Sequence, residues 1–202
     1  MFACAPGSGT HMSFETFKET ANLAIDYGEY IVLGGGEPTL NPRIIEMAAY
    51  ACFISEENFG PFMVTNGTCS KKAWGHLIQA HKAGKMIVQV SKDPWHDLSM
   101  IKNWVWDDAE KHNLWWGDRG RKTIVPKGRA AQNPDILVNE AYNYCYDKVI
   151  IEDDCIQIRA SPEGTIWVDG RKENYKIGDL SSETLDKAFE LLNKLEEEEH
   201  DD

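Results

Sequence analysis

Three glycines followed by a carboxylate have the clearest potential for chemistry in this chain: Gly34, Gly35 and Gly36 precede Glu37 and Pro38. Glycines let backbone amides and carbonyls approach a ligand closely, because no Cβ intervenes. A glutamate beside them can accept a hydrogen bond from a ligand ammonium group, and a proline fixes the loop. Taken alone, the run fits a site for an ammonium-bearing ligand, a phosphate-binding turn or a tight structural loop.

Other polar residues follow later apolar segments. They are Thr65 and Asn66 after residues 61–64, Ser91 and Asp93 after residues 86–90, and Arg129 after residues 122–125. Loops that leave the carboxyl ends of parallel strands meet on one side of the sheet. We therefore expect these residues to share one site with Glu37.

Strand and helix patterns alternate along the chain. Apolar strand segments are expected at residues 30–33, 61–64, 86–90, 122–125 and 149–151, and amphipathic helices at residues 13–25, 43–54, 71–83 and 98–112. Such alternation predicts parallel strands with right-handed crossovers, in an α/β barrel or an open doubly wound sheet. Since a helix opens the series, we expect a first strand to lie upstream or to have been lost.

The pattern changes after Glu152. Residues 156–159 and 165–168 alternate in hydropathy around the turn at residues 161–164, which predicts a β-hairpin. A last helix is expected from Ser182 to about Glu199. We therefore predict two domains: residues 1–151, and residues 152–202, which end in an acidic tail.

The order of these motifs resembles the radical S-adenosylmethionine (radical SAM) superfamily. Gly-Gly-Gly-Glu-Pro-Thr-Leu at residues 34–40 is similar to its SAM-binding loop. Residues 65–67 and 91–97 are similar to the ends of its third and fourth strands, the latter in a shortened form. Residues 126–130 resemble a turn found in the subgroup that modifies peptides, proteins or other macromolecules. The hairpin, residues 177–180 and the last helix resemble the SPASM or twitch extension of that subgroup.

The resemblance implies a partial (β/α) barrel, that is, a partial TIM barrel lacking its first strand, with a C-terminal β-hairpin and helix. It implies reductive cleavage of SAM to a 5′-deoxyadenosyl radical that abstracts hydrogen from a substrate. Glu37 and the backbone of residues 34–36 would orient the methionine part, with Pro38 fixing the loop. Thr65, Asn66, Ser91 and Asp93 would lie near the SAM sugar or the substrate. Arg129 would meet the SAM carboxylate or fix its turn.

The cysteines depart from the family pattern. The family holds a 4Fe-4S cluster with Cys-x3-Cys-x2-Cys after the first strand, and Cys4 by register follows that motif. Cys145 and Cys155 are too few for an auxiliary cluster and are better explained as small buried residues or plain thiols. We assign no metal ligand and expect the chain, truncated before the cluster loop, to be inactive alone. The alternative is a cluster-free barrel that binds SAM, a nucleotide or a protein.

Composition narrows the remaining possibilities. A net charge of −12 and the absence of a basic stripe argue against non-specific nucleic-acid binding. No apolar run is long enough for a membrane-spanning helix, so we expect a cytoplasmic protein without a membrane partner. The expected partners are a substrate, such as a peptide or protein, and a reductant protein if the chain is active.

His96 fits either a ribose or substrate contact or a helix cap. The spacing of the tryptophans at 104, 106, 115 and 116 indicates core packing or a partner surface rather than a ligand-binding site.

Overall fold

The structure, a computed structural model, describes residues 10–27, 30–34, 37–55, 60–92, 98–116, 144–145, 150–151, 157–169 and 174–200. The chain divides into two compact units, and the division falls inside helix α1 (Phe14–Asp26). The first unit contains Ala21–Val138, and the second contains Thr10–Thr20 and Asn139–Asp202. Each unit has a main sheet of its own.

Short apolar segments form a parallel sheet in the first unit. Its strands, hydrogen-bonded in this order, are β1 (Val32–Leu33), β2 (Phe62–Thr65), β3 (Ile87–Ser91) and β4 (Trp115–Trp116). The connections contain α2 (Ile44–Ile54), α3 (Lys71–Lys82) and α4 (Asn103–His112), with 3₁₀ turns η1 (Pro38–Leu40) and η2 (Leu98–Met100). The predicted α/β class is confirmed, and the strands within the described residues do not close into a barrel.

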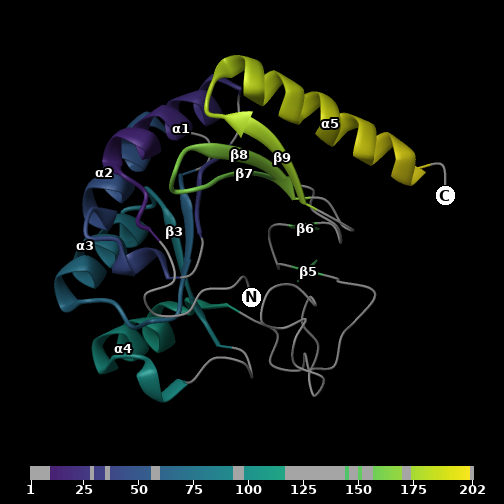
Figure 1. Ribbon diagram of the computed structural model, residues 1–202. Helices are drawn as coiled ribbons and strands as arrows, with labels where there is room; N and C mark the ends of the chain where they lie inside the picture. The colour runs from purple at the N-terminus through teal and green to yellow at the C-terminus, as the bar shows by residue number, and fades with distance from the viewer. Residues whose placement is uncertain are drawn as a thin grey trace. The chain divides into compact units, whose positions relative to one another are not determined.

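The two faces of the parallel sheet differ. Register pairs Met63 with Val88, and neither has exposed surface. Helix α3 contacts β3, with α2 and α4 packed beside α3 on the same side of that strand (Figure 1). Alternate side chains project to the other face, where Val32 is 52% and Ile87 is 42% exposed. We call this side the second face; its residues are Val32, Phe62, Val64, Ile87, Gln89 and Ser91.

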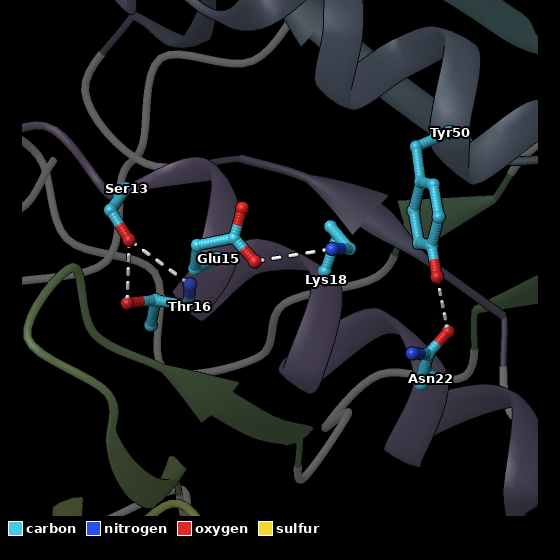
Figure 2. A network of polar contacts seen from close by, with 6 residues as sticks. All are labelled: Ser13, Glu15, Thr16, Lys18, Asn22 and Tyr50. Atoms are coloured by element: carbon cyan, nitrogen blue, oxygen red, sulfur yellow. Dashed lines mark hydrogen bonds and ion pairs between the residues drawn. The ribbon is translucent and has the colours of Figure 1, made fainter.

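Polar side chains fix the first two helices, as Figure 2 shows. The Ser13 hydroxyl accepts a hydrogen bond from the Thr16 backbone N–H at 3.0 Å, which caps the start of α1. Further along, the Tyr50 hydroxyl of α2 donates to Asn22 Oδ1 of α1 at 2.7 Å. The N-terminal turn of α1 is therefore capped, and its C-terminal half is tied to α2 within the first unit.

An antiparallel sheet organises the second unit. Its strands are β7 (Gln157–Ala160), β8 (Thr165–Asp169) and β9 (Asn174–Asp179), and helix α5 (Ser182–His200) contacts all three. Ile166 and Val168 of β8 and Leu185 and Ala188 of α5 are buried. The predicted hairpin and last helix are thus confirmed. Residues 174–179 form a third strand that the sequence did not predict.

Other predicted elements change in extent or pairing. The helix expected at residues 98–112 is divided into η2 and α4. A fourth parallel strand occurs at β4, whereas the strand expected at residues 122–125 lies outside the described residues. Residues 150–151 form β6 (Ile150–Ile151), which pairs antiparallel with β5 (Tyr144–Cys145) and not with the parallel sheet. No helix in the described segments is long and apolar enough to cross a bilayer.

Candidate functional site

Polar residues gather at the carboxyl edge of the parallel sheet. Thr65 at the end of β2 is in register with Val90 of β3, so the residues that follow them, Asn66 and Ser91, are neighbours along this edge. Glu37 reaches the same edge from the loop after β1. Of the predicted site residues, Gly34, Glu37, Pro38, Thr65, Asn66 and Ser91 are described, whereas Gly35, Gly36, Asp93 and Arg129 lie outside the described residues.

The Glu37 carboxylate joins the ends of β1 and β2. Its Oε1 accepts hydrogen bonds from the Thr65 hydroxyl at 2.7 Å and from the Thr39 backbone N–H at 3.0 Å. The Thr39 hydroxyl donates to the same oxygen. Oε2 accepts from the Asn66 backbone N–H at 2.6 Å. Glu37 thus caps η1 and also fixes the end of β2. Pro38 takes a first-turn position of η1, where no backbone N–H is needed.

These bonds are shared unequally between the two carboxylate oxygens. An ionised carboxylate offers about four acceptor positions, roughly two on each oxygen. Oε1 receives three donors, whereas Oε2 receives only the Asn66 amide among the described residues. All four donors are neutral, and no cation pairs with Glu37 within the described residues. Oε2 can therefore accept one more hydrogen bond, most favourably from a cation.

The turn after β2 is fixed by its own side chains. The Gly67 backbone N–H donates to Thr65 Oγ1 at 3.1 Å. Asn66 Oδ1 accepts from the backbone N–H of Thr68 at 3.0 Å and from its hydroxyl at 2.7 Å. The Asn66 oxygen is therefore used within the turn, so a ligand would meet the amide nitrogen of this side chain instead.

Gly67 also explains why the predicted helix at residues 98–112 is divided. Gly67 has φ +77°, and a Cβ there would lie 2.9 Å from Ile101 Cγ2. The Lys102 backbone N–H donates to Gly67 O at 3.2 Å. Because the Lys102 N–H donates to Gly67, it cannot also donate to a carbonyl of the preceding helical turn. The helix is therefore interrupted, and α4 begins at Asn103.

Sequence inspection missed Thr39 and Ile101 as parts of this edge. Thr39 had a local signal, because a carboxylate followed by Pro38 is typical of a helix start and leaves the next N–H groups to be capped. Ile101 had none, since its contact with Gly67 depends on how two distant segments pack.

The two described cysteines lie apart from any cluster of possible metal ligands within the described residues. Cys69 is buried close to Glu37, and burial together with the negative charge of Glu37 raises the pKa of its thiol to about 12. Burial also raises the pKa of Cys52 on α2. In the structure both thiols are therefore protonated at neutral pH. No three side chains of the His, Cys, Asp or Glu type come together as a metal site in the described part of the chain.

Two of the predicted tryptophans surround a lysine just beyond β3. Lys92 Nζ lies 5.0 Å from the ring centroid of Trp106 and 4.3 Å from that of Trp115. Glu110 Oε1 lies 3.3 Å from Lys92 Nζ and accepts from Trp115 Nε1 at 3.0 Å. This cation–π cluster ties β3, β4 and α4 together near the carboxyl edge. Its cation is the chain's own lysine, so the arrangement is structural.

Comparison of this chain with protein-family models, with curated proteins and with solved structures gives no match.

Proposed function

We propose that the carboxyl edge of the parallel sheet binds SAM in the manner of a radical SAM domain. The observation that carries this proposal is the Glu37 carboxylate, held in a fixed orientation by neutral donors and keeping an acceptor position on Oε2. SAM bears an ammonium group that suits such an acceptor. A phosphate group does not, because the carboxylate would repel it.

The neighbouring residues suit the rest of such a ligand. Gly34 is exposed at the end of β1, and among the described residues a Cβ built on it would meet only Val32 Cγ1, at 4.0 Å. A ligand can therefore approach this backbone closely. Ser91 and the Asn66 side chain lie along the same edge and offer hydroxyl and amide groups for sugar oxygens.

The proposal includes the fold relationship. Four parallel strands in consecutive order, without a reversal of strand order, are compatible with a segment of a (β/α) barrel. The hairpin and α5 are compatible with a twitch-like extension. In radical SAM proteins, a 4Fe-4S cluster supplies the electron that cleaves SAM. No three side chains of the His, Cys, Asp or Glu type gather as a metal site among the described residues, so we derive no cleavage step and propose SAM binding as their function.

An isothermal titration with two ligands tests this proposal. SAM carries the amino-acid group, whereas 5′-methylthioadenosine has the same nucleoside without it. We expect Glu37→Gln to weaken SAM binding by about tenfold or more, because it removes a charge-assisted contact. The same substitution should change 5′-methylthioadenosine binding by less than about twofold. Glu46→Gln is the matched control, since Glu46 is an exposed carboxylate on α2 that pairs with Arg43.

The same titration identifies the competing outcomes. Equal SAM affinity for the wild type and Glu37→Gln would contradict the proposal. Tight ATP binding by the wild type, insensitive to Glu37→Gln, would favour the alternative of a nucleotide-binding protein without SAM recognition. Retained 5′-methylthioadenosine binding by the variant shows that the edge remains folded.

A further inference from the structure

The second face of the parallel sheet contains a buried side-chain oxygen without a partner among the described residues. This atom is Oε1 of Gln89, the central residue of β3. Buried polar side-chain atoms in native proteins are nearly always hydrogen-bonded, so an exception needs an explanation. Leaving an acceptor unpaired destabilises the folded state, and a function at this position would account for it.

Sheet register places Gln89 among apolar neighbours. Val64 of β2 is its direct partner, and Ile87 precedes it on the same face of β3. Phe62 and Val32 continue the row that Ile87 begins. Among the described residues of this face, Gln89 is therefore a single amide surrounded by apolar side chains.

Gln89 also lies below the carboxyl edge. Ser91, which belongs to that edge, is two residues further along the same face, a rise of about 7 Å in a parallel strand. Extending the strand register by one residue brings Gly34 level with Val64 and Gln89. The unpaired amide therefore lies on the level at which β1 ends, below the residues of the carboxyl edge.

We propose that Gln89 recognises the substrate by accepting a hydrogen bond from an uncharged amide N–H that is attached to an apolar group. The apolar group contacts Val64 and Ile87, and the amide of Gln89 turns to meet the donor, since the last torsion of a glutamine side chain is soft. This inference rests on the proposed function in one respect: it assumes that the ligand bound at Glu37, above Gln89, is SAM. A neutral partner is expected because an unpaired charge would be costly among these side chains.

The first test needs no ligand. Gln89→Met keeps the length of the side chain and removes the unpaired oxygen, so the variant should melt about 2 to 4 °C higher than the wild type. Gln79→Met is the matched control, since Gln79 is exposed on α3 and its replacement should leave the melting temperature nearly unchanged. A lower melting temperature for Gln89→Met would show that the amide is satisfied in the free protein and would overturn the proposal.

The second test uses a matched pair of probes. N-benzylacetamide carries an amide N–H, and benzyl acetate has an oxygen in its place. In NMR titrations of the wild type, we expect the amide to bind about fivefold more tightly than the ester and to shift the side-chain NH₂ signals of Gln89. Gln89→Met should bind the two probes equally, which isolates the hydrogen bond.

The outcomes separate this inference from the SAM proposal. Equal binding of the two probes by the wild type, or a preference that survives in Gln89→Met, would overturn the role of Gln89. Neither result depends on SAM. If the wild type did not bind SAM, only the proposed function would be contradicted. Conversely, Gln89→Met should keep the wild-type affinity for SAM, because the substitution leaves the Glu37 carboxylate and its donors unchanged.

Discussion

Two carboxylates in the first unit hold neighbouring elements together in different ways. Asp108 of α4 accepts hydrogen bonds from Trp74 Nε1 of α3 at 2.8 Å and from Lys82 Nζ at 3.3 Å. His112 Nε2 lies 3.7 Å from the same carboxylate. Burial alone would favour the neutral acid, but these hydrogen bonds and the charges of Lys82 and His112 hold the pKa of Asp108 below its usual value.

Glu37 is held instead by neutral hydroxyl and backbone donors. The negative charge of Asp108 is compensated by cations of its own chain, whereas the charge of Glu37 is oriented without being compensated by the described residues. A carboxylate of the first kind joins helices. A carboxylate of the second kind joins strand tips and still attracts a cation from outside. This difference is the physical reason for assigning ligand binding to Glu37 and a structural role to Asp108.

Removing each carboxylate tests the difference most directly. Glu37→Ala should destabilise the fold by about 3 kcal/mol, because it leaves two partly buried hydroxyls and two backbone N–H groups without their acceptor. Asp108→Ala should cost about 1 kcal/mol, because Lys82 and His112 can turn to water and only the Trp74 N–H loses its partner. Urea unfolding followed by circular dichroism measures both.

Their response to salt sharpens this comparison. Raising the ionic strength should weaken the contribution of Asp108, whose Lys82 contact is between partly exposed charges, and should leave that of Glu37 almost unchanged. Equal losses of stability for the two variants, with equal salt dependence, would contradict the distinction between them.

A pair of glycines tests how tightly the Glu37 edge is packed. Gly67 and Gly84 both have positive φ, +77° and +68°, but only Gly67 faces a neighbour, Ile101, within 4 Å of an added Cβ. Gly84→Ala should therefore cost only conformational strain, about 1 kcal/mol, and Gly67→Ala should cost about 2 to 3 kcal/mol. Thermal unfolding measures both values.

The added cost at Gly67 should depend on its neighbour. In an Ile101→Ala background, the steric part disappears, so Gly67→Ala should cost about as much as Gly84→Ala. A cost at Gly67 that is unchanged by Ile101→Ala would show that strain alone, and not packing against Ile101, fixes the turn after β2.

Hydrophobic periodicity was sufficient to locate most elements of the fold. Helices α1, α2, α3 and α5 and strands β2 and β3 lie within a few residues of the positions expected from the sequence. The meeting of Glu37 with Thr65 and Asn66 could also be predicted, because strand tips in a parallel sheet share an edge. These features follow from local pattern and from topology.

The missed features depend on tertiary contacts. β4 consists of two tryptophans, which fit a helix face and a strand equally well until Val90 pairs with Trp115. β9 contains Gly178 and polar residues, and it becomes a strand by pairing with the apolar β8. The saturation of Glu37 Oε1 by Thr39 and Thr65 likewise required coordinates. The sequence predicted that Glu37 lies at the carboxyl edge, but it did not predict how many hydrogen-bond donors surround the carboxylate.

The smallest expected effect concerns a histidine beside the Asp108 cluster. His81 Nδ1 accepts a hydrogen bond from the Val88 backbone N–H at 3.3 Å. Burial, and then the charges of His112 and Lys82, lower the pKa of His81, although the Met86 backbone opposes this. The folded state therefore binds this proton less readily than the unfolded chain. The stabilising contribution of neutral His81 is complete above the unfolded value of 6.5 and is lost as pH falls below it through the folded pKa.

Urea unfolding between about pH 5 and pH 8 should reveal this loss, and we expect less than about 1 kcal/mol because the side chain is only half-buried. His81→Asn supplies a non-titrating acceptor for the Val88 N–H, so its stability should be less dependent on pH over this range. Glu37→Ala should keep the wild-type slope, because Glu37 belongs to the other polar cluster. If His81→Asn kept the full slope, the pH dependence would arise elsewhere, and the histidine would contribute to β3 only as a neutral acceptor. A slope lost in Glu37→Ala would instead show that the two carboxylate clusters are coupled, which would contradict the separation of structural and ligand-binding charge on which the comparison rests.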